Sequence, residues 1–246
     1  MALKITDRPS PNFNTRKAEV SLLVLHYTGM ESAEAALERL CDPDAQVSAH
    51  YLVDEDGSVV RLVEEDARAW HAGAGVWAGQ TDVNSASIGV EIVNGGHCYG
   101  LPDFPRRQID AVIALCEAVM ARWAIPAAGV IGHSDLAPER KLDPGERFPW
   151  ARLADHGIGI WPDPVDVDHG LAFAPELNEG QALAAVQSRL GEIGYGVKAD
   201  GVYGMRTRAV VAAFQRRFRP AHVDGLIDHE TEALIEAVAD LARRRA

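Results

Sequence analysis

The stretch Val130–Gly145 reads Val-Ile-Gly-His-Ser-Asp-Leu-Ala-Pro-Glu-Arg-Lys-Leu-Asp-Pro-Gly, and the rest of the chain can be understood from it. Two apolar residues and a glycine lead to His133 at the end of a predicted short strand, and Asp143 follows in a compact turn. Imidazole and carboxylate suit Zn²⁺, and a catalytic zinc takes three protein ligands with a fourth position left for water. His133 and Asp143 would supply two ligands, so a third must come from elsewhere.

His26 is the best candidate for the third ligand. It follows the apolar run Val20–Leu25, which is too continuously apolar for an edge strand and therefore predicts a strand inside a sheet. A histidine at the exit of a buried strand lies at the rim of the sheet, where open α/β sheets place their ligands. The sequence therefore predicts one zinc ion bound by His26, His133 and Asp143.

Six short phrases occur in order along the chain. They are Val-Leu-His-Tyr-Thr around His26, Ser-Ala-His-Tyr at Ser48 to Tyr51, Ala-Trp-His-Ala-Gly at Ala69 to Gly73, Ser-Ile-Gly-Val-Glu at Ser87 to Glu91, Gly-His-Ser-Asp at Gly132 to Asp135 and Lys-Leu-Asp-Pro-Gly at Lys141 to Gly145. Together they closely resemble the type 2 N-acetylmuramoyl-L-alanine amidases, a zinc family that also includes amidase-type phage lysozymes and peptidoglycan recognition proteins. The resemblance covers roughly residues 10 to 165.

This resemblance implies an α/β fold with a mixed central β-sheet flanked by helices. It also implies hydrolysis of the amide bond between N-acetylmuramoyl, or anhydro-muramoyl, and the L-alanine of peptidoglycan or muropeptides. The expected role is cell-wall turnover and recycling.

Glu91 and Lys141 are the predicted catalytic residues. Glu91 interrupts the apolar strand Ile88–Val93, where an unpaired carboxylate would be costly, and the family places a general base in this phrase. The alternative is a solvated face of an edge strand. Lys141 precedes Asp143 by two residues and so shares its side if the segment is extended. The resemblance implies that its ammonium stabilises an oxyanion, although a lysine before an Asp-Pro turn is ordinarily a surface residue.

Three further residues belong to phrases of the family. His71 lies on the long aperiodic segment 64–85 and resembles a position that lines the substrate cleft. Asn84 either binds substrate or shapes a turn, and the sequence does not separate the two. His50 is expected to be a packed, hydrogen-bonded core residue rather than a metal ligand.

A second unit follows residues 1–165, which we assign to the zinc amidase domain. Residues 166–178 are predicted to be a linker, because the stretch Trp161–Gly170 combines two prolines with several acids, and residues 179–246 are predicted to be a small all-α domain of three helices. The repeated phrases Asp200–Thr207 and Asp224–Thr231 predict a tight turn followed by a threonine that caps a helix. This unit resembles the three-helix peptidoglycan-binding domain, so its removal is expected to leave hydrolysis of a soluble muropeptide intact.

Local signals predict the remaining elements. Residues 1–19 are irregular; Ser32 is a predicted N-cap for a helix over 33–40; a hairpin turns at Asp54–Gly57; and residues 105–123 form an amphipathic helix that buries Cys116.

Composition limits the possible partners. The chain has 246 residues, 47% hydrophobic, and a formal net charge of -12, which argues against nucleic acid. We expect no membrane partner, because no apolar run approaches 18 residues, and we expect a monomer. The polar N-terminus and three scattered cysteines favour the cytoplasm; the periplasm or cell envelope is the alternative if an export signal was removed.

Two other function classes compete with the amidase. A non-catalytic peptidoglycan-recognition module would share the fold but typically lacks a metal ligand, whereas His26, His133 and Asp143 are all present. A different zinc hydrolase would have no obvious use for a peptidoglycan-binding module.

Overall fold

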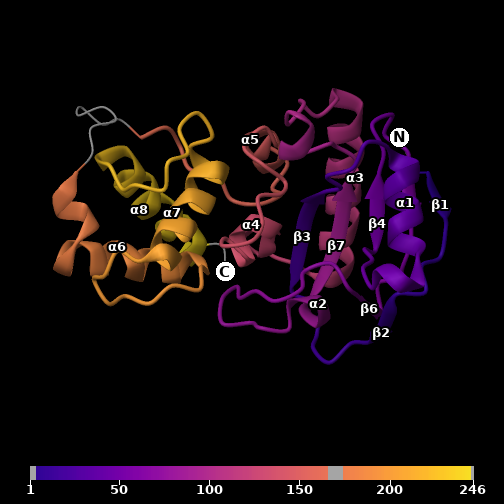
Figure 1. Cartoon of the computed structure of the whole chain (residues 1–246), viewed down its shortest axis with the longest axis horizontal. Helices are drawn as coiled ribbons and strands as arrows, with labels where there is room; N and C mark the ends of the chain where they lie inside the picture. The colour runs from indigo at the N-terminus through magenta and orange to yellow at the C-terminus, as the bar shows by residue number, and fades with distance from the viewer. Residues whose placement is uncertain (1–3, 166–173, 245–246) are drawn as a thin grey trace.

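The computed structural model describes residues 4–165 and 174–244, and Figure 1 shows a part built around a sheet beside a helical part. The strands are β1 (Ile5–Asp7), β2 (Phe13–Thr15), β3 (Leu22–Tyr27), β4 (Tyr51–Val53), β5 (Val59–Arg61), β6 (Ala67–Ala69), β7 (Ser87–Ile92) and β8 (Val130–Gly132). The α-helices are α1 (Ala33–Cys41), α2 (Val83–Ala86), α3 (Arg106–Trp123), α4 (His133–Leu136), α5 (Trp150–Ala154), α6 (Gly180–Ile193), α7 (Met205–Phe218) and α8 (His229–Arg244).

Six strands form one mixed sheet in the order β1-β5-β4-β7-β3-β8. The pairs β3–β7, β3–β8, β4–β7 and β1–β5 are parallel, whereas the hairpin β4–β5 is antiparallel. Strand β3 therefore has a neighbour on each side, which agrees with its continuously apolar sequence. The predicted mixed sheet flanked by helices is confirmed.

Side-chain alternation along β3 distinguishes the two faces of the sheet. Leu23 and Leu25 pack in the cluster that contains the buried residues of α3, whereas Leu22 and Val24 belong to the cluster on the opposite face. Because successive residues of a strand point to opposite faces, His26 lies on the face of Leu22 and Val24. The apolar pattern of β3 thus decides which face carries this histidine.

Helices cover both faces, and their caps agree with the sequence. α3 buries Cys116 against one face as predicted, while α1 packs Leu37 beside Leu52 of β4 on the other. The hydroxyl of Ser32 accepts a hydrogen bond from the N–H of Ala35 at 3.2 Å, as expected of an N-cap.

The N-terminal segment is more ordered than its sequence suggests. The prediction of an irregular arm over residues 1–19 is wrong for the described part, because β1 pairs with β5 and β2 pairs with β6. Each of these strands has three residues, too few for an alternating pattern to stand out. These segments become strands because they pair with β5 and β6, which are distant in sequence.

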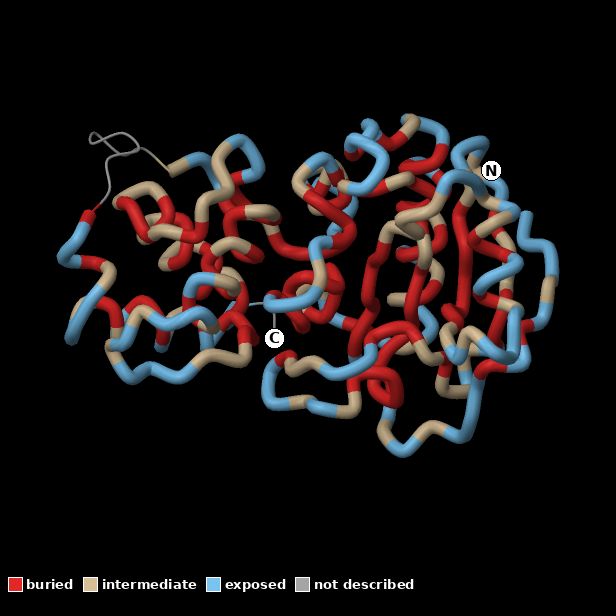
Figure 2. Tube along the Cα trace, viewed as in Figure 1, coloured by how far each residue is buried: buried red, intermediate tan, exposed pale blue. Residues whose placement is uncertain are grey.

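The helical part consists of α6, α7 and α8 within the described residues, as predicted. It shares one hydrophobic core with the sheet-containing part: Ile131 and Leu136 lie in the same cluster as Leu190 and Phe214. Figure 2 shows buried chain on both sides of this contact. The N–H of Ala78 also donates to the Gly194 carbonyl at 2.8 Å. The two parts are therefore packed together through apolar and backbone contacts.

The internal repeat has a structural basis. In each copy a buried glutamine accepts from the N–H of the Asp-Gly glycine and donates to the next carbonyl and to the threonine hydroxyl. These residues are Gln187, Gly201, Val202 and Thr207 in the first copy and Gln215, Gly225, Leu226 and Thr231 in the second. The prediction that each threonine caps a helix is wrong. Both threonines lie inside the first turn of their helices, where they connect the helix to the preceding one.

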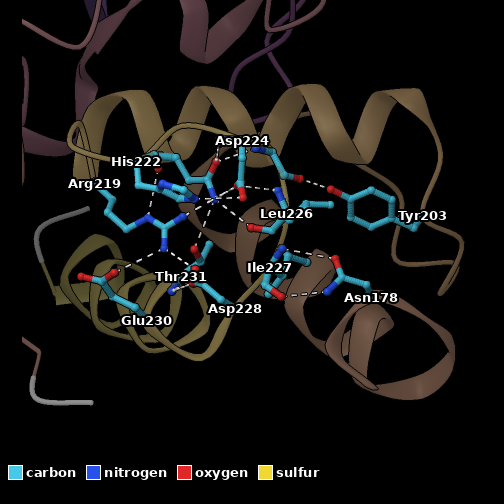
Figure 3. A network of polar contacts seen from close by, with 12 residues as sticks. Asn178, Tyr203, Arg219, His222, Asp224, Leu226, Ile227, Asp228, Glu230 and Thr231 are labelled. Atoms are coloured by element: carbon cyan, nitrogen blue, oxygen red, sulfur yellow. Dashed lines mark hydrogen bonds and ion pairs between the residues drawn. The ribbon is translucent and has the colours of Figure 1, made fainter. Parts of the chain in front are cut away.

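The second copy carries an additional ionic network, drawn in Figure 3. Arg219 at the end of α7 donates to Asp228 at 2.5 Å and to Glu230 at 3.3 Å. Asp228 in turn accepts from the N–H of Thr231 at 2.8 Å. Arg219 and Asp228 are both buried, so this pair joins the end of α7 to the start of α8 without solvent screening.

The predicted linker lies partly outside the described residues, since the structure describes none of 166–173. Residues Pro175–Asn178 form a 3₁₀ turn, and Leu177 is buried in the core shared by both parts. Among the described helices, none combines the length and apolar character needed to cross a membrane. The domain boundaries at 165 and 178 stay predictions.

Truncation after Val165 is expected to destabilise the remaining chain, in contrast to the outcome that the sequence alone predicts. It would expose the apolar residues that face α6–α8 and would remove Arg217, the partner of buried Asp135. Breaking a buried ion pair on one side costs about 3–5 kcal/mol. Thermal unfolding and dye binding should show a lower transition temperature and exposed apolar surface. An unchanged transition with full activity on a soluble muropeptide would contradict this.

Candidate metal centre and active site

The three predicted ligands converge on one point. Nδ1 of His26 lies 2.9 Å from Nδ1 of His133, and Oδ2 of Asp143 lies 3.0 Å from the first and 2.9 Å from the second. All three side chains are buried. The donor atoms thus form a nearly equilateral triangle.

The topology of the sheet explains this convergence. His26 is near the carboxyl end of β3, and His133 follows β8, the parallel neighbour of β3. The N–H of Ser134 donates to the main-chain carbonyl of Asp143 at 2.9 Å, which holds the ligand-bearing turn beside α4. Adjacent parallel strands end at the same edge, so ligands far apart in sequence meet there.

The orientation of His133 follows from its second ring nitrogen. Nε2 lies 2.9 Å from the carbonyl oxygen of Ala72. A carbonyl can only accept, so Nε2 carries the proton and Nδ1 presents a lone pair to the centre.

His26 is oriented in the same way by a chain of hydrogen bonds. The hydroxyl of Ser87 donates to the Val83 carbonyl at 2.5 Å, so its oxygen accepts from Nε2 of His71 at 3.2 Å. Nδ1 of His71 then accepts from Nε2 of His26 at 3.0 Å. The other ring nitrogen of His26, Nδ1, therefore carries no proton and also presents its lone pair to the centre.

The charge states suit a bound cation. Burial, together with the neighbouring His133, lowers the pKa of His26 to about 4, so its ring is neutral at physiological pH. Burial alone would raise the pKa of Asp143, but the adjoining His133 and His26 hold it below its ordinary value. Two imidazole lone pairs and a carboxylate oxygen thus face one another at about 3 Å, an arrangement that a cation at their centre would stabilise. This donor set fits zinc.

His71 and Asn84 lie directly behind the ligands. His71 is buried and supports His26, although it also lines the cavity described below. Oδ1 of Asn84 accepts from the N–H groups of His71 and Ala72 at 3.0 and 2.8 Å, so it shapes this turn. Their predicted substrate-binding roles stay predictions.

Two neighbours explain how His71 fits against the sheet. A Cβ on Gly89 would lie 2.4 Å from the His71 ring, so only glycine leaves space for it on this face of β7. His50 is fully buried, and its Nδ1 accepts from the N–H of Gly89 at 2.9 Å. The expectation that His50 is a hydrogen-bonded core residue is confirmed.

A cavity of about 390 Å³ opens beside the metal centre, and Glu91 and Lys141 both line it. Glu91 pairs in register with His26 across β3 and β7, so the two side chains are neighbours on one face. Strand β7 is interior, which removes the edge-strand alternative for Glu91. Its Oε2 atom is buried and has no hydrogen-bond partner among the described residues. Burial, reinforced by the charge of Asp143, raises the pKa of Glu91 well above its ordinary value.

Arg140 also lines this cavity, and the sequence analysis did not single it out. Its Nε donates to the Ala74 carbonyl at 2.9 Å, and its Nη2 donates to the carbonyl of Ala72, which His133 also contacts. The only sequence signal was its place beside Lys141 in the ligand-bearing stretch. Its hydrogen bonds depend on a loop that is remote in sequence.

Comparisons with known proteins show the family of this chain. A family model described as N-acetylmuramoyl-L-alanine amidase matches residues 16–146, more than half of the chain. The chain belongs to this amidase family. A second model, described as a putative peptidoglycan binding domain, matches residues 179–235. The sequence-based prediction of an amidase with a C-terminal module of this type is confirmed.

Two Escherichia coli K12 relatives show how far the similarity extends. The amidase is 39% identical to N-acetylmuramoyl-L-alanine amidase AmiD over 235 residues, 90% of this chain and 83% of that protein. It is 34% identical to 1,6-anhydro-N-acetylmuramyl-L-alanine amidase AmpD over 164 residues, 59% of this chain and 87% of that protein.

Solved structures of amidases are similar to this structure over nearly the whole chain. E. coli AmiD in complex with anhydro-N-acetylmuramic acid-L-Ala-D-γ-Glu-L-Lys superposes with a TM-score of 0.78 at 36% identity and covers 93% of this chain and 92% of its own. Pseudomonas aeruginosa AmpDh3 in complex with anhydromuramic pentapeptide has a TM-score of 0.77 at 31% identity, with 97% and 96% covered.

Replacing Glu91 by glutamine is expected to stabilise the metal-free amidase at pH 8. The raised folded-state pKa means that ionised Glu91 opposes folding; this penalty is complete above the folded-state pKa and absent below the unfolded value of about 4.3. The unfolding temperature of Glu91→Gln should therefore exceed that of the parent at pH 8, and the difference should vanish near pH 4.

Thermal unfolding with a chelator at both pH values measures this difference. Glu38→Gln, at an exposed position on α1, is the matched control and should leave the unfolding temperature unchanged. Equal stability of Glu91→Gln and the parent at pH 8 would contradict the argument.

Proposed function

We propose that this amidase uses one zinc ion to hydrolyse the bond between the lactyl carbonyl of anhydro-muramoyl peptides and their L-alanine. The observation that carries the proposal is that a candidate metal site and a free carboxylate line the same cavity. Three metal-ligand lone pairs converge there, and an unpaired carboxylate lies on the neighbouring strand. Amide hydrolysis needs both an electrophilic centre and a group that moves protons.

His26, His133 and Asp143 would hold the zinc ion, with Nδ1 of each histidine and Oδ2 of the aspartate as donors. When bound, zinc supplies Lewis acidity that polarises the scissile carbonyl and acidifies water. The hydrogen bonds from His133 to Ala72 and from His26 to His71 orient the rings and leave their lone pairs available.

Glu91 is the proposed general base and acid. Its free oxygen accepts a proton from the attacking water, and the same carboxyl then delivers that proton to the leaving nitrogen of L-alanine. The raised pKa suits this exchange, because a carboxyl with a pKa nearer neutrality both takes and returns a proton efficiently.

Lys141 is proposed to stabilise the negative charge that develops on the carbonyl oxygen. Its presence in the cavity wall together with Asp143 supports this role. An ammonium group aimed at the developing oxyanion lowers the barrier because its attraction strengthens as the charge forms.

His71 and Asn84 are proposed to contribute to substrate binding through the cleft wall that they build together. His71 is a lining residue of the cavity, and Asn84 holds the backbone of the His71 turn. In this proposal Asn84 acts by keeping the wall in shape.

The anhydro-muramoyl substrate is supported by the two relatives whose complexes contain anhydromuramic peptides. The region that matches a peptidoglycan-binding model is proposed to bind the same polymer or its fragments.

His133→Ala and Glu91→Gln should separate metal binding from proton transfer. His133→Ala is expected to lose zinc and activity together. Glu91→Gln is expected to keep zinc while turnover falls by roughly 10² to 10⁴, the usual contribution of positioned acid–base catalysis. Elemental analysis measures zinc, and mass spectrometry of products from an anhydromuramoyl tripeptide measures turnover.

His156→Ala is the control for these two variants, because His156 lies just after α5, is exposed, and its side chain forms an ion pair with Glu117, outside the candidate site. Stoichiometric zinc in His133→Ala would refute the ligand assignment. Parental turnover in Glu91→Gln would make that residue structural.

We further propose the cytoplasm as the compartment, where muropeptides are recycled. The support is the three free cysteines, of which Cys98 is exposed, since an oxidising compartment would put such a thiol at risk. Fractionation of cells that express the native reading frame should find the activity with cytoplasmic proteins. Release of the activity by osmotic shock would instead favour the periplasm.

A further inference from the structure

A buried ionic cluster connects the C-terminal helices to the metal-ligand segment. Asp135 lies two residues after His133 in α4, and its Oδ2 accepts from Nη1 of Arg217 at 2.8 Å. Its Oδ1 accepts from the hydroxyl of Tyr195 at 2.7 Å. Asp135 is 1% exposed, Tyr195 3% and Arg217 4%, so solvent does not substitute for these contacts.

Asp135 fixes the backbone on which His133 sits. Its Oδ2 also accepts from the N–H of Gly132 at 2.8 Å, so the carboxylate bridges the residues on either side of this ligand. Helix α4 has only four residues, and a helix of this length has no stability of its own. The carboxylate must therefore be held from outside if the turn is to keep one geometry.

Arg217 provides that support from more than one direction. Its Nη2 donates to the carbonyl of Val130 at 3.1 Å, at the start of β8. Its guanidinium lies over the Trp150 ring at 4.1 Å, where a cation–π contact restricts it further. The planar group thus joins β8, α4 and α5 through contacts that a lysine could not reproduce together.

We infer that Arg217 and Tyr195 are positioning residues for the metal ligand His133, so that the C-terminal helical part completes the metal centre in addition to any role in wall binding. Both act through Asp135 and neither touches the ligand. The inference rests on the proposed function, because it requires that His133 binds zinc.

A second ion pair at the same junction supplies a control. Nη1 of Arg206 lies 2.9 Å from Oε2 of Glu139, and both side chains are partly exposed at 35% and 53%. Arg206 lies on α7, as Arg217 does, but Glu139 is further from His133 along the chain and makes no described hydrogen bond to the β8–α4 turn. Loss of this pair weakens the junction without freeing Asp135.

The test measures zinc affinity in the full-length chain for Arg217→Met, Tyr195→Phe and Arg206→Met. Tyr195→Phe removes a single hydroxyl and keeps the ring, so it stays informative even if Arg217→Met folds poorly. Zinc dissociation constants come from competition with a chromophoric chelator, and the visible spectrum of the cobalt-substituted protein reports the geometry of the ligands.

Arg217→Met and Tyr195→Phe are expected to weaken zinc binding by about 10-fold to 100-fold, the usual effect of losing support behind a ligand, and to alter the cobalt spectrum. Arg206→Met should stay within about twofold of the parent. Arg217→Lys should restore little of the zinc affinity that Arg217→Met loses, because one ammonium cannot contact Asp135, Val130 and Trp150 together.

Parental affinity in both Arg217→Met and Tyr195→Phe would overturn the inference, and so would equal weakening by Arg206→Met. These outcomes are distinct from failure of the proposed function. In that case the parent chain itself would bind no zinc, and both proposals would fall.

Discussion

Parallel pairing of β3 with β7 on one side and with β8 on the other is the constraint on which the active site depends. It brings the ends of three strands to one edge, with His26 opposite Glu91 and His133 directly after β8. A shift of one residue in the register of β7 would turn Glu91 to the face covered by α3. The backbone hydrogen bonds between these strands therefore determine both which side chains face the candidate site and which pack against α3.

Burial of polar groups at this edge has an energetic cost that function explains. Imidazole and carboxylate lone pairs face one another at about 3 Å, and Glu91 has a buried oxygen without a partner in the described structure. Such an arrangement opposes folding unless a cation and a substrate occupy it. The surrounding apolar clusters and the well-satisfied contacts of His50 and Asn84 offset this cost.

The junction between the two parts of the chain differs from a flexible tether. Arg217 and Asp135 form a buried ion pair, and Phe214 lies in one hydrophobic cluster with Leu136. Separating this pair would leave an unpaired buried charge, which is costly, so the pair favours one relative orientation of the two parts. The helical part of this amidase therefore packs against α4, the helix that begins at His133 (Figure 1).

Local sequence was enough to predict the apolar β3, the capped helix after Ser32 and the long α3, because periodicity and capping residues are encoded within short windows. The sequence also singled out three side chains that the structure brings together as a candidate metal site. It failed for β1 and β2, whose pairing partners are remote, and for the threonines of the repeat, whose hydroxyls bind a glutamine on another helix. The sequence by itself determined which residues could bind a metal and move a proton. Only the tertiary structure decided which ring nitrogen of His133 faces the candidate metal site, what holds Asp135 and that the two parts share a core, because each depends on groups that distant segments bring together.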